Sequence, residues 1–301
     1  MIPGRRYLGG LSIRLTPLTD PDFRPFSRRI AWLAADDDGN PVGSAFLRLN
    51  SRESHAHLAE LELNVHPAER RRGIGSQLLD AVITAARDHD VRTVLADARV
   101  DSPADLFLAH HGFTVGLTLI YARLRLAAAD TVPAEGAEGY RLVSWAGVVP
   151  DEWAQTFTDA RSGMNDAPTG GIAYGEDAWD VERTRYVAQV VEQRGEHLTT
   201  VAAVDEATGT IAGFTELVVP GDGKGEAQHY GTAVLPDHRG HGLALWMKAE
   251  QLRQVRSSFP DLDALLTDTV STNTPMRRVN ERLGYELTHT DNRRTLDICT
   301  Y

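Results

Sequence analysis

The sequence predicts an α/β (α+β) protein in which two similar domains follow one another along the chain. The first observation is a long-period repeat, which fixes the architecture before single elements are assigned. Three glycines recur at offsets of 170, 169 and 172 residues: Gly43 and Gly213, Gly73 and Gly242, Gly112 and Gly284. The second observation is that the same types of segment surround these glycines in the same order in both halves.

Each half begins with a hairpin of two apolar strands around a Gly-containing turn, at 30–47 and at 200–217. Another strand leads into a Gly-rich loop and then into a helix with apolar residues at helical spacing. Those apolar positions are Leu78, Leu79, Val82, Ala85 and Ala86 in the first half and Leu245, Ala249 and Leu252 in the second. A short strand and a second helix follow, and the second helix ends at Gly112 or Gly284.

The domain boundary is predicted in the segment 127–138, which is rich in small residues, proline and glycine and has no periodicity. We therefore expect a first domain at 1–126, a linker at 127–138 and a second domain at 139–301.

The composition is typical of a globular protein, with 301 residues, 42% of them hydrophobic and 24% charged. The net charge of −11 argues against a general nucleic-acid binder, because neutralising phosphates needs a basic surface. No apolar run approaches the roughly 20 residues of a membrane span, and no signal-type segment follows the first residues. We expect a cytoplasmic protein without nucleic-acid or membrane partners, and Cys299 has no partner for a disulfide.

The Gly-rich loops are the strongest functional signal. They read Arg70-Arg71-Arg72-Gly73-Ile74-Gly75-Ser76 and Arg239-Gly240-His241-Gly242-Leu243-Ala244. A glycine loop that opens a helix presents free backbone N–H groups and the positive end of the helix dipole, and arginines add charge-assisted contacts, so each loop suits a phosphate. Neither loop matches the Walker motif or the dinucleotide fingerprint.

These loops, each after a strand that ends in Val-x-Pro or Val-Leu-Pro, resemble the acetyl-CoA pyrophosphate loop of the GNAT family of N-acetyltransferases. The segments 101–113 and 273–285 resemble the second cofactor-binding motif of that family. The resemblance implies two tandem GNAT folds, each a mixed, splayed sheet flanked by helices, with acetyl-CoA as the cofactor. The tandem arrangement is similar to that of mycothiol synthase-like actinobacterial proteins.

In that family pantetheine lies against the strand before the loop, so the resemblance also implies the cofactor contacts. They are Leu63, Asn64, Val65, Arg70, Arg71, Arg72, Gly73, Ile74, Gly75 and Ser76 in the first half, and Ala233, Val234, Leu235, Arg239, Gly240, His241, Gly242, Leu243, Ala244 and Asn273 in the second.

The two halves are unequal in the segment that walls the acceptor site of this family, which is 17–29 in the first half and 144–198 in the second. The family often has a tyrosine four residues before the glycine of its second motif, where Leu108 and Asn280 stand here. Leucine cannot donate a proton, so we expect the first half to be structural or to hold acetyl-CoA without turnover. We assign the chemistry to 139–301.

The candidate catalytic residues are Glu216, His229, Tyr230 and Asn280. Glu216 interrupts an apolar strand, and His229 has a suitable intrinsic pKa for a base. Strand alternation places Tyr230 opposite His229 unless a bulge re-aims one of them. An amide cannot act as an acid, so Tyr230 or a water is expected to replace Asn280 in protonating the thiolate, unless the thiolate leaves unprotonated.

The loop 161–171 supplies candidate substrate contacts, Asn165 and Asp166, which suit a cationic ligand; the alternative is a capping turn between two helices. The leading hypothesis is therefore acetyl transfer from acetyl-CoA to a primary amine of a small molecule by direct attack, without a metal, in a monomer or homodimer. The alternative hypothesis is a non-catalytic protein that binds or senses acetyl-CoA.

Overall fold

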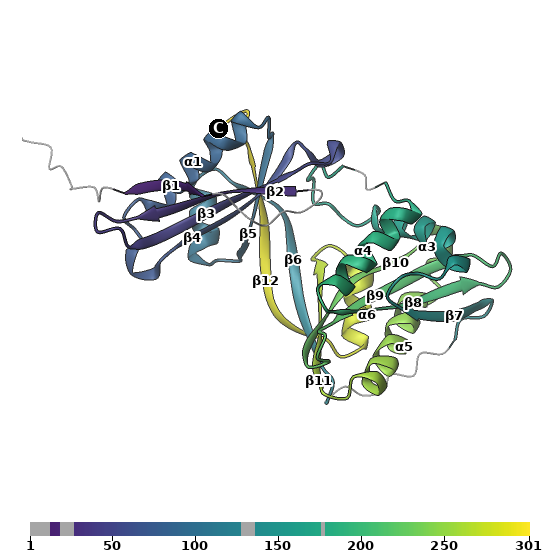
Figure 1. Cartoon of the computed structure of the whole chain (residues 1–301). Helices are drawn as coiled ribbons and strands as arrows, with labels where there is room; N and C mark the ends of the chain where they lie inside the picture. Colours follow the sequence, from purple (N-terminus) through teal and green to yellow (C-terminus); the bar gives the residue numbers. More distant parts are fainter. Residues whose placement is uncertain (1–12, 19–26, 128–135, 176–177) are drawn as a thin grey trace, which may run out of the picture. The chain divides into compact units, whose positions relative to one another are not determined.

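A computed structural model describes residues 13–18, 27–127, 136–175 and 178–301, and the chain forms two compact units. Unit 1 comprises Met1–Leu117, Gly170–Gly175 and Asn292–Tyr301, and unit 2 comprises Thr118–Thr169 and Glu176–Asp291. Both units combine a mixed sheet with helices, as the sequence predicts (Figure 1). The units do not follow the expected boundaries at 126 and 139, and residues 128–135 of the expected linker lie outside the described residues.

Among the described residues, unit 1 contains the first five strands in the chain, the start of the sixth and two helices. These are β1 (Arg14–Leu18), β2 (Ser27–Ala35), β3 (Pro41–Asn50), β4 (Leu58–Val65), α1 (Ile74–Asp88), β5 (Thr93–Arg99), α2 (Pro103–His110) and the start of β6 (Thr114–Arg125), with 3-10 turns at Glu53–His55 and Pro67–Glu69. The strands β1 to β4 are antiparallel neighbours, and β5 is parallel to β4. Helix α1 packs against β3 and β4.

The predicted apolar stripe of α1 forms the centre of the unit 1 core. Leu78, Leu79, Val82 and Ala86 are buried, whereas Ala85 is half-buried and packs at the edge of the same cluster. The helix forms because these residues recur on one face, and it stays in place because that face is removed from water.

Unit 2 repeats this plan with two additional helices. Its elements are β7 (Tyr140–Ala146), α3 (Ala154–Arg161), α4 (Val181–Gln193), β8 (His197–Asp205), β9 (Ile211–Val219), β10 (Gly225–Val234), α5 (Leu243–Ser258), β11 (Leu262–Val270), α6 (Thr274–Arg282) and the start of β12 (Glu286–Asp297), with 3-10 turns at Asp151–Trp153, Ser162–Met164 and Pro236–His238. The neighbours run β6-β11-β10-β9-β8-β7, with β10 and β11 parallel.

Helices cover both faces of the unit 2 sheet. Ala202 and Val204 of β8 pack with α3, whereas Val201 and Ala203 pack with α5, as the alternation of side chains along a strand requires. Figure 1 shows α3 and α4 on one side of β8 and β9 and α5 on the other. All nine residues of β9 are buried for this reason, which explains why its sequence is apolar almost throughout.

The repeated glycine of each hairpin is required by a close approach of two strands. A Cβ atom on Gly43 would lie 2.9 Å from the carbonyl oxygen of Asn64, and one on Gly213 would lie 2.7 Å from that of Ala233. Both distances are too short for a methyl group, so the repeat preserves a steric constraint in both units.

The last strand of each sequence half belongs to the other unit over part of its length. Leu119–Arg125 of β6 pairs antiparallel with Ala264–Val270 of β11 in unit 2. Residues 292–297 of β12 lie next to β5 in unit 1. The sequence does not reveal this exchange, because neither strand carries a local signal that identifies the sheet it completes.

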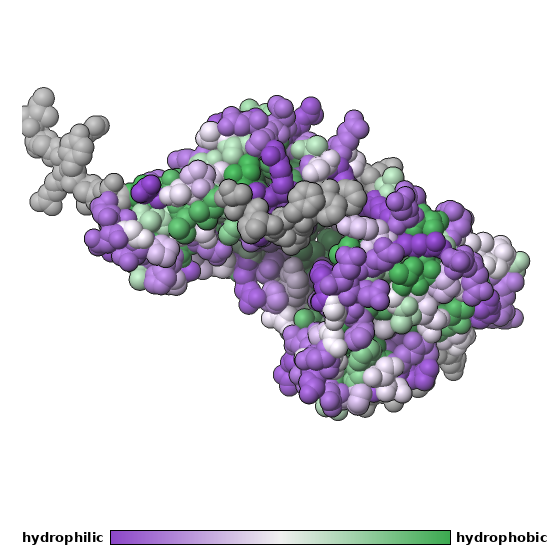
Figure 2. Space-filling model, viewed as in Figure 1, coloured by the Kyte–Doolittle hydropathy of each residue, from purple (hydrophilic) through white to green (hydrophobic). Residues whose placement is uncertain are grey.

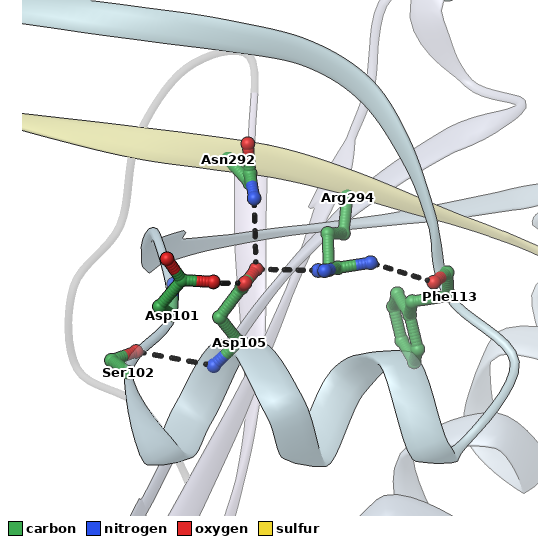
Figure 3. A network of polar contacts seen from close by, with 6 residues as sticks. All are labelled: Asp101, Ser102, Asp105, Phe113, Asn292 and Arg294. Carbon is green, nitrogen blue, oxygen red and sulfur yellow. Dashed lines mark hydrogen bonds and ion pairs between the residues drawn. The ribbon is translucent and has the colours of Figure 1, made fainter.

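A buried polar network holds the end of β12 to α2 in unit 1 (Figure 3). Asp105 accepts hydrogen bonds from Asn292 at 3.1 Å and from Nε of Arg294 at 2.6 Å. The second carboxylate oxygen accepts from the backbone N–H of Asp101 at 3.2 Å, and Ser102 caps the helix by accepting from the N–H of Asp105. The hydrogen bond from Arg294 is the main reason that the pKa of Asp105 lies below its ordinary value.

The visible surface is mostly hydrophilic, with apolar side chains in small patches on the face drawn in Figure 2. Within the described residues, we find no helix with the length and apolar character that crossing a membrane requires.

The network at Asp105 gives a stability prediction. Asp105→Ala leaves the largely buried Arg294 without its anion, so we expect the free energy of unfolding to fall by about 3 kcal/mol. In the wild type this contribution is present above the ordinary aspartate pKa of about 4 and is lost as the pH falls below it, because the folded-state pKa is the lower one. Urea denaturation at pH 7 measures the change.

Asp80→Ala is the matched control, since Asp80 is exposed on α1 and its loss should change stability by less than about 0.5 kcal/mol. Equal effects of the two substitutions would contradict a structural role of the network.

Candidate functional site

The loop between β4 and α1 has features that suit an anion. After Val65 the chain makes the turn Pro67–Glu69, and Gly73 adopts φ 82°, in the left-handed region that favours glycine, directly before α1. Gly73 has no side chain with which to cap this helix, so the N–H groups of its first turn lack an intrahelical acceptor and suit a ligand. The Nε atom of Arg70 donates to the carbonyl oxygen of Val65 at 3.2 Å, which fixes this arginine beside the loop.

A cavity of about 850 Å³ opens beside this loop within unit 1. It exists because the parallel pairing of β4 with β5 covers only Leu58 to Glu60, while β4 continues to Val65. Of the predicted cofactor residues, the cavity is lined by Leu63, Asn64, Val65, Arg70, Arg71, Gly73, Ile74, Gly75 and Ser76. Arg72 does not line it and instead pairs with Glu69 at 2.5 Å.

The loop between β10 and α5 has the same construction. The turn Pro236–His238 follows β10, and Gly242 has φ 77° directly before α5 and, like Gly73, has no side chain with which to cap the helix. Pairing of β10 with β11 ends at Gln228, while β10 continues to Val234. The Nε atom of Arg239 donates to the carbonyl oxygen of Val234 at 3.0 Å, the same contact that Arg70 makes in unit 1.

The remaining predicted cofactor residues of unit 2 lie along this strand, loop and helix. They are Ala233 and Val234 at the end of β10, Leu235, Gly240 and His241 in the loop, and Leu243 and Ala244 at the start of α5. Asn273 is the cap of α6, because its side chain accepts from the N–H of Met276 at 3.3 Å.

Asp166 meets the second loop. Its carboxylate lies 2.8 Å from the guanidinium of Arg239, and both side chains are half exposed. An anion of the protein therefore already contacts the arginine that we expect to meet a phosphate. Asn165, the other predicted substrate contact, is exposed at the end of the turn Ser162–Met164.

Glu216 forms a buried ion pair that the sequence did not indicate. Its Oε1 atom lies 2.5 Å from a guanidinium nitrogen of Arg161, the last residue of α3. The guanidinium carbon of Arg161 is 4.4 Å from the ring centroid of Trp179 and 4.8 Å from that of Phe157. Burial raises the pKa of Glu216, although Arg161 acts in the opposite direction. A carboxylate with a raised pKa is a stronger base than an exposed one.

His229 and Tyr230 do not converge on one point. The pairing of β10 with β9 sets His229 opposite Leu217 and Gly231 opposite Glu216, so Tyr230 is the extra residue of a β-bulge. Tyr230 is 44% exposed, and its hydroxyl accepts a hydrogen bond from Arg194. His229 is buried, and its Nε2 atom lies 2.7 Å from the hydroxyl of Tyr285.

A second buried polar group lies beside His229, in the interior of unit 2. Lys248 of α5 donates from Nζ to Oδ1 of Asn280 at 2.7 Å, and Nζ lies 4.9 Å from the ring centroid of Tyr285. The amide of Asn280 donates in turn to the hydroxyl of Thr269 at 3.5 Å. We call Lys248, Asn280, His229, Tyr285 and Thr269 the interior polar cluster.

Burial controls the protonation of this cluster. It lowers the pKa of Lys248 to about 7 and raises that of the Tyr285 hydroxyl above its ordinary value. Burial, together with the charge of Lys248, holds the pKa of His229 well below its ordinary value, so His229 is neutral near pH 7.

Sequence reasoning missed Arg161 and Lys248 for different reasons. Arg161 lies 55 residues from Glu216, and no local pattern joins them. Lys248 could have been found, because it stands between Leu245 and Ala249 on the apolar stripe of its helix, where a lysine is unexpected. Among the described residues, no group of three or more His, Cys, Asp or Glu side chains is arranged to hold a metal ion.

Comparison with known proteins finds similarity to one family of enzymes. The chain matches the family model for the acetyltransferase (GNAT) family over residues 10–113 and 164–285. The mycothiol acetyltransferase of Mycolicibacterium gilvum is 25% identical over 91% of this chain and 94% of that protein. The mycothiol acetyltransferase of Thermobispora bispora is 30% identical over 82% of each protein.

Solved structures support the fold. A tandem GNAT protein from the clavulanic acid biosynthesis pathway has a TM-score of 0.76 and 24% identity over 95% of this chain and 99% of its own. A GCN5-related N-acetyltransferase from Sphaerobacter thermophilus has a TM-score of 0.69 and 20% identity over 89% of this chain and 80% of its own.

The pair of Arg161 and Glu216 gives a prediction about stability. Arg161→Met leaves the carboxylate of Glu216 buried without its cation, so we expect the free energy of unfolding to fall by about 3 kcal/mol. The double variant Arg161→Met with Glu216→Gln removes both charges and should recover more than half of this loss. Urea denaturation of the two variants measures the difference, and equal losses would contradict the coupling of the two residues.

Proposed function

Since the chain belongs to the acetyltransferase (GNAT) family, we propose that it transfers the acetyl group of acetyl-CoA to a primary amine of a small molecule, with the reaction in unit 2. The mycothiol acetyltransferase names of its relatives favour a small acceptor.

The observation that carries the proposal is the twin construction of the two loops. Each has an uncapped helix start, a glycine in the left-handed region and an arginine tied to the preceding strand. CoA carries phosphates that need such donors, and it carries a long polar arm that can pair with backbone groups. Residues 61–65 of β4 and 229–234 of β10 lie beyond the paired parts of β5 and β11, so their backbone groups on that side suit the arm.

Glu216 is the residue to which we assign the base. In the β9–β10 pairing it stands opposite Gly231, on the part of β10 that has separated from β11. A carboxylate there lies at the level of the arm, and burial strengthens it as a base. His229 is less suited because burial and the charge of Lys248 hold its pKa well below the ordinary value, which makes it a weak base. Tyr230 is less suited because its hydroxyl is turned to Arg194 at the surface.

The reaction balances as follows. Glu216 accepts a proton from the ammonium group of the acceptor, the neutral nitrogen forms a bond to the acetyl carbonyl carbon, and the bond from that carbon to sulfur breaks. The electron pair of the broken bond goes to sulfur, which takes up a proton, while the nitrogen gives up its second proton. Two protons leave the nitrogen and sulfur takes up one, so a net of one proton is released to solvent for each amide formed.

Unit 1 is proposed to bind acetyl-CoA without transferring the acetyl group. Its cavity is lined by the predicted cofactor residues, but Leu108 stands at the position of Asn280 and belongs to the apolar core. Residues 19–26, in the segment that corresponds to α3 and α4, lie outside the described residues.

Calorimetry with acetyl-CoA tests the assignment of the loops. We expect two binding sites per chain, of which Arg70→Ala weakens one and Arg239→Ala the other, each by about 10- to 100-fold, because a charge-assisted contact to phosphate is worth roughly 1.5–3 kcal/mol. Arg72→Ala is the matched control in unit 1, since Arg72 pairs with Glu69 and does not line the cavity. A single site that responds to neither Arg70 nor Arg239 would overturn the assignment.

Turnover tests the chemistry. With acetyl-CoA and a panel of primary amines, Glu216→Gln should lower kcat by about 100-fold through loss of the base, and change the KM for acetyl-CoA by less than about threefold. Release of the CoA thiol measures both constants. Glu226→Gln is the control, because Glu226 lies on β10 but pairs with Arg123 at the surface. Binding of acetyl-CoA without turnover on any amine would favour the alternative, a non-catalytic acetyl-CoA-binding protein.

A further inference from the structure

The proposed reaction leaves one step without a residue, namely the protonation of the departing sulfur. Asn280 has no acidic proton, and Tyr230 lies at the surface with Arg194. A proton donor for this step has to lie where β10 and β11 separate, because that is where the arm of acetyl-CoA is proposed to run.

The interior polar cluster lies at this separation. His229 directly follows Gln228, the last residue of β10 that pairs with β11. Thr269 lies three residues beyond Leu266, the last residue of β11 that pairs with β10. Lys248 reaches Thr269 through Asn280, so its ammonium group is placed between α5, α6 and the free end of β11.

The amino group of Lys248 is buried and has no counter-ion among the described residues. Its side chain is 2% exposed, and no carboxylate of the described part of the chain forms an ion pair with it. Its neighbours that can titrate are His229 and Tyr285, both neutral near pH 7. A buried charge without an opposite charge is costly, and an anion that forms nearby during the reaction would offset that cost.

Unit 1 offers an internal comparison, because the two halves repeat. At the offset of 169 residues that relates Gly73 to Gly242, Lys248 corresponds to Leu79, and at the offset of 172 residues that relates Gly112 to Gly284, Asn280 corresponds to Leu108. Both leucines are buried in the apolar core of unit 1. The fold is therefore satisfied by an apolar pair at these positions, and the polar pair of unit 2 is not needed for packing.

The use of lysine rather than arginine also indicates that position 248 is not explained by packing alone. Of the 31 lysine and arginine residues of the chain only two are lysines, Lys224 and Lys248. Arginine keeps its proton under all ordinary conditions, whereas a buried lysine can release one. The chain thus uses a cation that can lose a proton at this interior position.

We propose that Lys248 is the acid that protonates the sulfur of CoA in unit 2, and that Asn280 positions its ammonium group. When the carbon–sulfur bond breaks, the electron pair moves to sulfur and one N–H proton of Lys248 moves to it, leaving a neutral amine and a thiol. Lys248 then regains a proton from solvent as CoA leaves. This inference rests on the proposed function and deepens it. A donor with a pKa of about 7 transfers its proton favourably to a thiolate whose thiol has a pKa near 8.5.

Direct observation of the lysine tests the contact with sulfur. We use full-length Arg70→Ala protein, in which unit 1 is expected to bind CoA about 10- to 100-fold more weakly. Lysine labelled with carbon-13 gives two Cε signals in this chain, and Lys224→Arg assigns them. We expect the Lys248 signal to shift when CoA is added and to shift much less when desulfo-CoA, which lacks only the sulfur, is added at saturation. Equal shifts with the two ligands, or none with either, would overturn the inference.

Turnover of the amine panel provides the second readout. Lys248→Met should lower kcat by about 100-fold, and Lys248→Arg should lower it by a similar factor, because arginine keeps the charge but cannot give up a proton. Affinity for CoA should change less than about threefold in both, and Lys224→Met should leave turnover unchanged. Urea denaturation checks that Lys248→Met folds, which is expected since a methionine replaces a buried charge by an apolar chain of similar length.

The outcomes separate this inference from the proposed function. Full activity in Lys248→Met together with active wild-type protein overturns the role of Lys248 and leaves acetyl transfer standing. Binding of CoA by the wild type without turnover on any amine overturns acetyl transfer, and the comparison of CoA with desulfo-CoA still decides whether Lys248 meets the sulfur.

Discussion

The early end of parallel pairing is the constraint on which both units depend. In unit 1 the last pair between β4 and β5 is Glu60 with Leu95, and in unit 2 the last pair between β10 and β11 is Gln228 with Leu266. Each separated strand continues into a loop that starts a helix, so backbone groups of the strand and of the helix remain available in one place. Unpaired backbone groups are costly inside a protein unless a ligand or water satisfies them. The sheet geometry therefore directly produces the place at which we propose that the ligand binds.

The sequence predicts this geometry well because its signals are local. Gly73 and Gly242 permit the left-handed turn before a helix, Gly43 and Gly213 permit close approach of two strands, and the apolar stripe of α1 specifies its buried face. Each requirement acts within a few residues, so each is met by a recognisable residue type at corresponding positions of both halves. The repeat then makes these signals specific, since the same three glycines recur at nearly constant offsets.

The sequence does not predict contacts between residues that lie far apart in the chain. The exchange of β6 and β12 depends on which strand completes which sheet, and neither the apolar β6 nor the largely polar β12 carries a local signal for its partner. The pairs of Asp105 with Arg294 and of Arg161 with Glu216 join residues that are far apart in the chain, and a charged residue in a sequence does not name its partner. Lys248 differs from these, because its place on an apolar stripe is a local signal that the prediction of the helix passed over.

The ion pair between Asp166 and Arg239 does not exclude the proposed binding of a phosphate to this loop. The pair is half exposed on both sides, and exposed ion pairs are worth about 0–1 kcal/mol. A contact from arginine to a phosphate is charge-assisted on both sides and stronger, so a phosphate can displace Asp166 at small cost. The aspartate contacts one end of the guanidinium, and the Nε atom of Arg239 donates to the carbonyl oxygen of Val234. The same tie exists between Arg70 and Val65 in unit 1, where the cavity stays open beside the loop. The backbone therefore orients both arginines. The units differ in that Asp166 contacts the guanidinium of Arg239 in unit 2, whereas Arg70 lines the cavity in unit 1.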